Sequence, residues 1–546
     1  MTLGMLDEVG DDLLRARVCI IGAGAAGITL ACELGAAGLK VLLVEAGGLN
    51  PDGGLADYYG GTATAPHADP AQFRRTVFGG TTGLWGGRCV PFQPIDFEKR
   101  DYVSNSGWPI AYEDLARHYP RALQYCDAGA FDFTASGSVQ SFAQTIEGFD
   151  GGDVVITDRI ERYSLPTDFG HRYRDQIRQS THITALLGGR CLRLMKAAGT
   201  DRIDGAELVD RAGRKRTVSA QVFVLATGGV EVPRLLMLSD QQGAGFGNRG
   251  DALGRYYMCH FENTAGSLVP LGARVVFHFE RTTDGVYCRR QLRFRPEAQR
   301  HNRLLNTVFR LHFPSYSDAS HGSSVMSTIY LAKSVLVPEY RNILQHGAEA
   351  PASPTLQHVR NVVTGLPQLA KFASDYLFRI RLARRKLPYT LVPNADGSFP
   401  VDFNSEQTPL ASNRVTLSDD VDRHGLRRVH IAWRLSEEDI DSAHRAFQLL
   451  RETLNRSGRA RLGFDEQHLR ERISRSVPLG GHHIGTARMA ASERMGVVDA
   501  NCAVFGLPNL YIASSAVFPT SSDANPTLSI AALAIRMAGH LRSALT

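Results

Sequence analysis

The sequence predicts an α/β fold in which one parallel sheet is assembled from distant parts of a 546-residue chain. Residues 17–21 form an apolar, β-rich run that leads into a glycine-rich turn and a helical stretch. Two further runs, residues 222–226 and 509–513, also have the composition of buried parallel strands. Because long inserts separate the three runs, we expect several domains or one large discontinuous domain.

The turn after the first run carries the pattern G-x-G-x-x-G at Gly22, Gly24 and Gly27. A helix is predicted over residues 25 to about 37, followed by an apolar strand, "KVLLVEAG", that contains Glu45. Gly22 permits a tight turn, Gly24 lets the backbone approach a pyrophosphate, and Gly27 lets the helix pack on the strand. The helix N-terminus would hold the phosphates, and Glu45 would accept hydrogen bonds from the ribose. The segment therefore predicts a site for FAD or NAD, since an acid here disfavours a 2′-phosphate.

The rest of the chain favours FAD over NAD. The run at residues 222–226 leads into Thr227-Gly228-Gly229, and the C-terminal part offers a strand, an irregular polar loop and a closing apolar helix. One nucleotide domain built from N-terminal, middle and C-terminal pieces describes a large flavoprotein better than a compact NAD dehydrogenase. The sequence contains no G-x-S-x-G elbow, H-E-x-x-H motif or P-loop that would indicate another reaction.

Composition limits the expected partners and compartment. The net charge of +6 is mildly basic, but no long Lys/Arg block with interleaved aromatics indicates nucleic-acid binding. The eight cysteines include no C-x-x-C pair, so we expect neither a metal site nor disulfides, and a cytoplasmic protein. No apolar run reaches the roughly 18 residues that span a bilayer, and the acidic N-terminus is unlike a signal peptide, so no integral membrane segment is expected.

The most basic stretch is "FRIRLARRKLPY", residues 378–389, in which Phe378, Ile380 and Leu382 lie among arginines. We expect a solvated helix face there, with a membrane-surface or partner contact as the alternative.

Five motifs follow one another along the chain: "GAGAAG…VEAGG", "FGGTTGLWGG", "ATGGVEVPRLLMLS", "HHIGTARM" and "ANPTLSIAALAIRMAGHL". Together they resemble the glucose–methanol–choline (GMC) oxidoreductases, nearest the branch of pyranose oxidases and fructose or gluconate dehydrogenases. The resemblance implies a doubly wound, Rossmann-like FAD-binding domain and a second α+β substrate domain built on an antiparallel sheet. The FAD domain would take residues 1–90, 181–259 and 476–546, and the substrate-binding or cap domain residues 91–180 and 260–475.

The resemblance also places the FAD contacts. The stretch "RRTVFGGTTGLWGGRC", residues 74–89, is too rich in glycine for a regular element, and relatives lay it against the flavin. Leu84 stands where pyranose-oxidase-like proteins can carry a flavin-linking His, so we expect non-covalent FAD. The expected FAD-binding residues are Gly22, Gly24, Ala25, Ala26, Gly27, Glu45, Ala46, Gly79, Gly80, Thr82, Trp85, Gly86, Gly87, Cys191, Ala226, Thr227, Gly228, Ser515, Pro526 and Thr527.

The resemblance assigns catalytic roles to His482 and Asn525. The family's base stands three residues before the Gly of an H-x-x-G-T motif, here Gly485, and a neutral imidazole is suited to take a hydroxyl proton. Asn525 precedes Pro526 in the closing motif, and its amide can orient the substrate oxygen without competing for the proton. The adjacent His483 is left with an open role.

The function implied is FAD-dependent oxidation of CH–OH to a carbonyl on a sugar, amino sugar or polyol-like small molecule, with hydride passing to flavin N5. The alternatives are a non-redox GMC-type lyase and a silent flavoprotein subunit that docks a partner. Whether O₂ or an external electron acceptor reoxidises the flavin is left open, as is the oligomeric state. His260, Arg488 and Met489 are expected to be structural.

The middle of the chain is less informative. Residues 403–439 predict two strands around the polar turn "SDDVDRHG", and a helix is expected from residue 437 to about residue 457. Between residues 264 and 385 no signature is recognisable, so we expect substrate specificity to be determined there.

Overall fold

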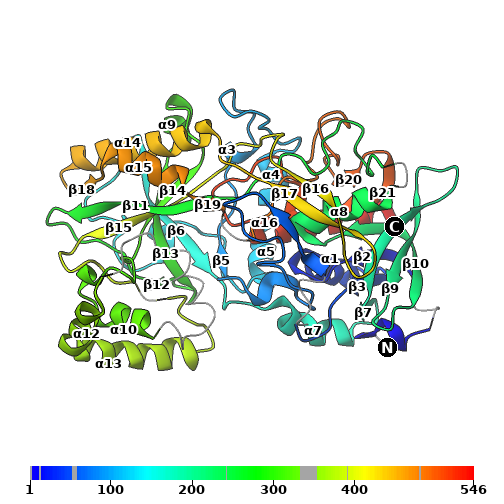
Figure 1. Ribbon diagram of the computed structural model, residues 1–546, viewed down its shortest axis with the longest axis horizontal. Coiled ribbons are helices and arrows are strands. Elements are labelled where there is room, and N and C mark those ends of the chain that lie inside the picture. Colours follow the sequence, from blue (N-terminus) through cyan, green and yellow to red (C-terminus); the bar gives the residue numbers. More distant parts are fainter. Residues whose placement is uncertain are drawn as a thin grey trace.

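The computed structural model describes residues 3–10, 14–51, 58–240, 243–332, 353–389, 391–478 and 481–545. Two large sheets lie side by side along the long axis of the molecule (Figure 1). The mainly parallel sheet lies in the half that contains both chain termini, and the antiparallel sheet lies in the other half. A small three-stranded sheet completes the described β-structure.

The parallel sheet brings the three predicted apolar runs together. Strand β2 (Arg15–Ile21) pairs in parallel with β3 (Val41–Glu45) and β10 (Lys215–Leu225), and β10 pairs in parallel with β21 (Leu507–Ile512). The predicted α/β class with a Rossmann-like sheet is therefore confirmed. The other strands are β1 (Leu3–Met5), β7 (Ile183–Leu187), β20 (Ala503–Val504), and the antiparallel pair β8 (Arg190–Lys196) and β9 (Ile203–Val209).

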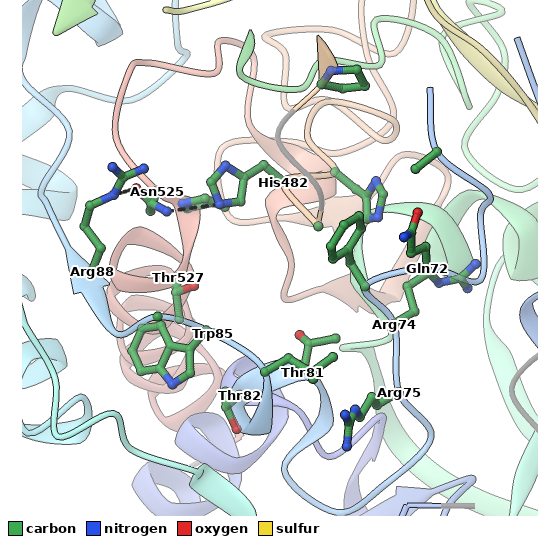
Figure 2. Close-up of a pocket in the computed structure, with 18 of the residues that line it drawn as sticks. Gln72, Arg74, Arg75, Thr81, Thr82, Trp85, Arg88, His482, Asn525 and Thr527 are labelled. Atoms are coloured by element: carbon green, nitrogen blue, oxygen red, sulfur yellow. Dashed lines mark hydrogen bonds between the residues drawn. The ribbon is translucent and has the colours of Figure 1, made fainter. Parts of the chain in front are cut away.

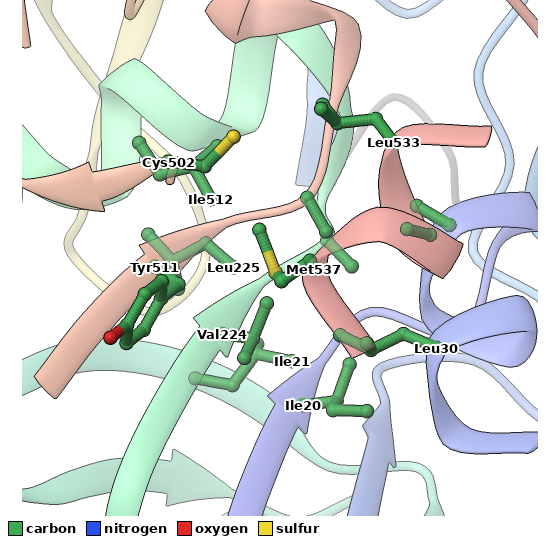
Figure 3. Close-up of a cluster of buried hydrophobic side chains, with 14 of the residues drawn as sticks. Ile20, Ile21, Leu30, Val224, Leu225, Cys502, Tyr511, Ile512, Leu533 and Met537 are labelled. Carbon is green, nitrogen blue, oxygen red and sulfur yellow. The ribbon is translucent and has the colours of Figure 1, made fainter. Parts of the chain in front are cut away.

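Helices α1 (Ala25–Ala36) and α16 (Pro526–Leu545) pack on this sheet and on each other. Figure 3 shows Leu30 of α1 and Met537 of α16 beside Ile20 and Val224, with Leu533 one turn earlier on α16, and all five side chains are buried. Helices from the two ends of the chain thus pack into one hydrophobic core. The neighbouring helices are α4 (Tyr112–Ala116), α5 (Tyr119–Tyr125), α7 (Phe169–Gln179) and α8 (Gly228–Ser239).

The second sheet is antiparallel, as the resemblance implied. Helices α14 (Glu437–Ser457) and α15 (Glu466–Ser474) cover one face, where the ring of Phe447 packs edge-on against Phe309 and Phe403. Its strands are β5 (Arg88–Cys89), β6 (Val155–Tyr163), β11 (Phe261–Pro270), β12 (Glu280–Arg281), β13 (Tyr287–Phe294), β14 (Thr307–Leu311), β15 (Phe399–Ser405), β18 (Ala460–Gly463) and β19 (Val477–Pro478).

The predicted helix over residues 437–457 is found as α14. Ser436 caps its start by accepting from the backbone N–H of Asp439, and Gly458 ends it in a left-handed conformation with φ of 65°. Shorter helices lie in the connections between these elements: η1 (Leu6–Glu8), η3 (Gly80–Gly83), α3 (Pro94–Phe97), α6 (Ala135–Ser138), α9 (Pro296–His301), η4 (Ala319–His321) and η6 (Ser515–Val517).

A helical layer lies against the antiparallel half, at the lower left of Figure 1. It consists of α10 (Ser324–Leu331), α12 (Thr355–Thr364), α13 (Leu366–Asp375) and a π-helix, η5 (Tyr376–Arg381). The predicted solvated helix at residues 378–389 is only partly correct, because the chain leaves the π-helix and Leu387 becomes buried. Arg385 anchors this turn by donating to the carbonyls of Tyr163 and Asp127. None of the described helices combines the length and apolar character needed to cross a bilayer.

The small sheet contains β4 (Gly61–Ala63), β16 (Arg414–Val421) and β17 (Arg427–Ala432). Strand β16 continues through the predicted polar turn, so the turn is confined to residues 422–426. The reason is Asp422, which accepts from the backbone N–H groups of His424 and Leu426 and pairs with Arg190 and Arg234. Strands β16 and β17 of this sheet adjoin α8 of the parallel half although they lie in the predicted cap segment, and the domain boundaries stay a prediction.

Candidate active site

One large cavity of about 2070 Å³ connects the two halves. Its first end lies at the carboxyl ends of β2, β3 and β10, where open α/β sheets bind ligands. Its second end is walled by β11, β13, β14 and β15 of the antiparallel sheet. Pockets for single drug-sized ligands are usually about 300–1,000 Å³, so this cavity has room for a dinucleotide and a further small molecule.

The first end is shaped by the G-x-G-x-x-G turn. Gly22 has φ of +104°, and a Cβ on Gly27 would lie 1.9 Å from the carbonyl oxygen of Gly22. A Cβ on Gly24 would meet nothing within 4 Å, so the chain is open towards the cavity there. Helix α1 begins after Gly24 without a side-chain cap, which leaves its first backbone N–H groups for a ligand.

A second glycine turn meets the first. Gly79 has φ of +103°, and a Cβ there would lie 2.5 Å from the backbone nitrogen of Gly170. A Cβ on Gly80 would approach the Cα of Gly24 to 3.0 Å, so side chains are excluded where the two turns converge. This cradle fits a dinucleotide. Of the predicted FAD-binding residues, all line the cavity except Gly27 and Gly79, which pack behind its wall.

Glu45 holds the first turn against the second strand. Its two carboxyl oxygens accept from the backbone N–H groups of Ala23 and Gly47, each at 2.9 Å. Burial raises the pKa of Glu45 to about 7, and the backbone hydrogen bonds oppose this rise. The carboxyl group also lines the cavity, where a lone pair can accept from a ribose hydroxyl.

His482 and Asn525 face each other across the middle of the cavity (Figure 2). The amide nitrogen Nδ2 of Asn525 lies 3.1 Å from Nε2 of His482. The guanidinium of Arg88 donates to Oδ1 of Asn525 at 2.5 Å and lies 3.7 Å from the carboxylate of Glu161. Because Oδ1 accepts from Arg88, the NH₂ group of Asn525 must point towards His482.

Backbone contacts bring these distant residues together. The backbone groups of Ile484 and Met258 exchange hydrogen bonds of 3.1 and 2.9 Å beside the two histidines. Gly485 has φ of +91°, and a Cβ there would lie 2.3 Å from the carbonyl oxygen of Tyr256. Asn525 directly precedes α16. The loop of His482 is therefore pinned by the strand-like segment that leads into β11, and α16 positions the amide.

The other ring nitrogen of His482 contacts His260. The two Nδ1 atoms are 2.8 Å apart, and Nε2 of His260 lies 2.9 Å from the carbonyl oxygen of Ser521. Burial lowers the pKa of His482 well below its ordinary value, and the neighbouring His260 and Arg88 lower it further. His482 is therefore neutral near pH 7 and can accept a proton. His260, expected only to be structural, touches the candidate base directly.

The adjacent His483 belongs to a separate polar cluster. The Tyr257 hydroxyl lies 2.6 Å from Nδ1 of His483, 2.8 Å from Nε2 of His67 and 3.2 Å from Sγ of Cys259. Burial also lowers the pKa of His483. Sequence reasoning missed His67, Tyr257 and also Arg88, because no spacing pattern links these positions. For Arg88 alone, its place at the end of the glycine-rich stretch was a usable signal.

Comparisons with known proteins agree with this geometry. The segment that contains both His482 and Asn525, residues 409–534, matches a family model described as GMC oxidoreductase. Residues 16–254 match a model described as pyridine nucleotide-disulphide oxidoreductase. The chain therefore carries a GMC oxidoreductase domain. It is an FAD-dependent oxidoreductase that acts on alcohols.

Two relatives extend over nearly the whole of this chain. The 2-methyl-1,2-propanediol dehydrogenase of Mycolicibacterium austroafricanum is 23% identical over 96% of this chain and 95% of its own. The paromamine 6′-oxidase of Streptomyces fradiae is 24% identical over 97% of this chain and 92% of its own. The fold is shared with pyridoxine 4-oxidase from Mesorbium loti, with a TM-score of 0.54 and 18% identity over 96% of this chain and 99% of that one.

The far end of the GMC cavity is polar and charged. Arg310 pairs with the carboxylates of Glu161 and Asp402, each at 2.8 Å, and Arg289 donates to the Tyr389 hydroxyl. Burial raises the pKa of Glu262, on β11, to about 8. Part of this wall comes from residues 264–385, for which the sequence had no signature. Such a wall offers donors and acceptors at many points around a polyhydroxylated ligand.

Proposed function

We propose that this GMC oxidoreductase oxidises a CH–OH group of a sugar, amino sugar or polyol to a carbonyl. The observation that carries the proposal is the His482–Asn525 pair, which faces the cavity between the dinucleotide cradle and the charged wall. The charged wall supports a substrate with several hydroxyl or amino groups. The names of the relatives, a propanediol dehydrogenase and a paromamine 6′-oxidase, point in the same direction.

In the proposed mechanism, Nε2 of His482 accepts the hydroxyl proton of the substrate. The NH₂ group of Asn525 donates to the same oxygen as its negative charge develops, and Arg88 holds the amide in that orientation. Bound FAD supplies the hydride acceptor. The residues that would hold it are the two glycine turns, Glu45 and the start of α16. Leu84 carries no nucleophile, so we propose that FAD is held without a covalent bond.

The test is anaerobic mixing of the FAD-loaded protein with a panel of sugars, amino sugars and polyols, followed by readmission of oxygen. We expect the flavin absorbance to bleach with one chemical class of substrate, and recovery in air would identify O₂ as an acceptor. Flavin that stays oxidised with every alcohol, together with substrate cleavage, would contradict the proposal and favour a lyase. The cytoplasmic location expected from the cysteines is part of the same proposal.

The role of His482 is tested separately. We expect His482→Ala to retain FAD and to lose about 10²–10⁴-fold in kcat, the usual contribution of a general base. A matched control is His468→Ala, at a position where the side chain is 80% exposed and is not among the residues that line the cavity. Full activity of the His482 variant would overturn the assignment of the base.

A further inference from the structure

The His260 ring lies between His482 and a backbone carbonyl, and this fixes the direction of two hydrogen bonds. The carbonyl oxygen of Ser521 can only accept, so Nε2 of His260 must carry the hydrogen. Burial lowers the pKa of His260, which is fully buried, so the ring is neutral and its Nδ1 is an acceptor. The hydrogen in the 2.8 Å contact therefore sits on Nδ1 of His482.

The opposite side of His482 leads independently to the same tautomer. Arg88 donates to Oδ1 of Asn525, which turns the NH₂ group of that amide towards Nε2 of His482. An NH₂ group can only donate, so Nε2 must present its lone pair. The two sets of contacts share no residue other than His482. Both leave the basic nitrogen on the cavity side.

We infer that His260 is a positioning residue that holds His482 in the tautomer with hydrogen on Nδ1 and a free lone pair on Nε2. The inference rests on the proposed role of His482 as the base. Without His260, only the contact with Asn525 disfavours a hydrogen on Nε2, so a larger share of neutral His482 carries it there, where it cannot take a substrate proton. When His482 becomes an imidazolium, its Nδ1–H still donates to His260, which stabilises the charge where solvent is excluded.

The test compares His260→Leu, which can make neither hydrogen bond, with His260→Asn, whose amide can donate to Ser521 and accept from His482. We expect the Leu variant to lose about 10²–10⁴-fold in kcat with KM changed only a few-fold, as for other wrong-tautomer variants. The kcat of the Asn variant should be at least tenfold higher than that of the Leu variant. Tyr257→Phe is the matched control, since it removes the corresponding contact of His483 and leaves the His260–His482 contact in place.

A second readout separates positioning from general damage. In protein labelled with ¹⁵N-histidine, a His482→Gln variant identifies the His482 signals. We expect a protonated Nδ1 in the wild type and in His260→Asn, and a measurable share of the tautomer with hydrogen on Nε2 in His260→Leu. An unchanged tautomer and kcat in His260→Leu, with His482→Gln inactive, would overturn this inference alone. An active His482→Gln would instead overturn the proposed role of His482 as the base, on which this inference rests.

A different observation concerns the outer surface formed by α12, α13, η5 and the residues up to 386, called here the basic apolar surface. Among the described residues, fifteen large apolar side chains are exposed, and seven of them lie between residues 356 and 382. The largest exposed fractions are 78% for Leu356, 66% for Leu382 and 63% for Phe378. No residue of α13 is buried, and in α12 only His358 is. These helices therefore leave their apolar sides uncovered.

The same surface carries the excess positive charge of the protein. Residues 353–389 contain seven Lys and Arg side chains and a single acid, Asp375, whereas the net charge of the whole chain is +6. The rest of the chain is thus balanced. Two copies of this chain meeting through the surface would bring like charges together, which disfavours self-association. Exposed aliphatic and Phe side chains among Arg and Lys are instead the composition of segments that lie on anionic lipid.

We propose that the basic apolar surface docks the protein on an anionic membrane surface. Apolar side chains such as Phe378 and Leu382 would enter the headgroup region while the basic side chains contact lipid phosphates. Tyr376, Ile380 and Arg381 also line the active-site cavity, so docking would bring the cavity wall next to the lipid. A membrane-bound electron acceptor or substrate would then be close to the site.

The test is co-sedimentation of the FAD-loaded protein with vesicles of phosphatidylcholine alone or mixed with phosphatidylglycerol. We expect binding to the anionic vesicles, release at high salt, and weak binding to neutral vesicles. The variant with Arg360→Gln, Lys371→Gln and Arg379→Gln should bind about 100-fold more weakly, from about 1 kcal/mol per basic residue. The matched control changes Arg117, Arg214 and Arg249, which are exposed outside the surface, to Gln.

Absence of binding to anionic vesicles, or an equal loss in the control variant, would overturn the proposal. Concentration-dependent dimers that depend on the same three residues, or a stable complex with an acidic protein in place of vesicle binding, would also overturn it.

Discussion

Replacing Asn525 by Asp exchanges the NH₂ group of the side chain for an oxygen, so a hydrogen-bond donor of the active site becomes an acceptor. The variant keeps the size of the side chain and the contact with Arg88, but it puts an oxygen where the NH₂ group faces His482. The site loses the donor that holds the substrate oxygen, and removing one such donor costs about 10²–10³-fold in kcat. It also gains a negative charge beside the proposed base.

The size of the charge effect follows from the distance. Two unit charges 3.1 Å apart, the Nδ2–Nε2 separation, attract by about 5 kcal/mol at an effective dielectric constant of about 20. Arg88, 2.5 Å from Oδ1, neutralises much of the new charge, so we take about half of that energy. Protonated His482 is then favoured by about 2–3 kcal/mol, which moves the acid limb of the kcat/KM profile up by about two pH units.

The direction of the change in the pKa of His482 determines the pH range over which kcat/KM has to be measured. A carboxylate raises the pKa of His482, so the base is lost as the pH falls and recovers as the pH rises. We therefore expect the acid limb of the kcat/KM profile of Asn525→Asp, measured by anaerobic flavin reduction, to lie about two pH units above that of the wild type, with a lower plateau because the donor is lost. Asn525→Ala removes the donor without the charge and should lower kcat with little change in the limb. An acid limb unmoved in Asn525→Asp with FAD still bound would refute the reasoning.

Three other predictions concern the FAD domain. In the FAD-free protein, Glu45→Gln should flatten the pH dependence of the unfolding free energy: burial raises the pKa of Glu45 to about 7, so its stabilising contribution is present below about pH 4.5 and is lost by about pH 7. Wild type and variant that change in parallel over this range would contradict the burial argument. Leu533→Ala, at a fully buried position, should cost about 2–5 kcal/mol in denaturant unfolding, and a loss below 1 kcal/mol would mean that the site collapses around the smaller side chain. Gly539→Ala lies on the same helix but is exposed, with free space around the new Cβ, and should raise the unfolding free energy by about 0.5–1 kcal/mol. A lower unfolding free energy would contradict a helical backbone with free space at this position.

The sequence was informative wherever chemistry depends on local spacing. The glycine turn, the strand that carries Glu45 and the capped helix at residues 437–457 each depend on residues close together in the chain, and all are found as predicted. The polar turn before β17 was overestimated because Asp422 is held by Arg190 and Arg234 from other parts of the chain. No local pattern contains that information.

The family motifs predicted His482 and Asn525 from short stretches of sequence, but only the tertiary structure decided what surrounds them. Arg88, His260 and Ser521 reach the pair from β5, from the segment before β11 and from the loop before α16. Their effect depends on which atom donates and which accepts, and this is a property of directions in space. The sequence by itself determined the fold class and a dinucleotide site, because dinucleotide binding needs glycine at particular steps along one turn, and the remaining motifs of the chain favoured FAD over NAD. The tautomer of the base and the exposure of the basic apolar surface were decided by packing, because both depend on contacts between residues far apart in the chain.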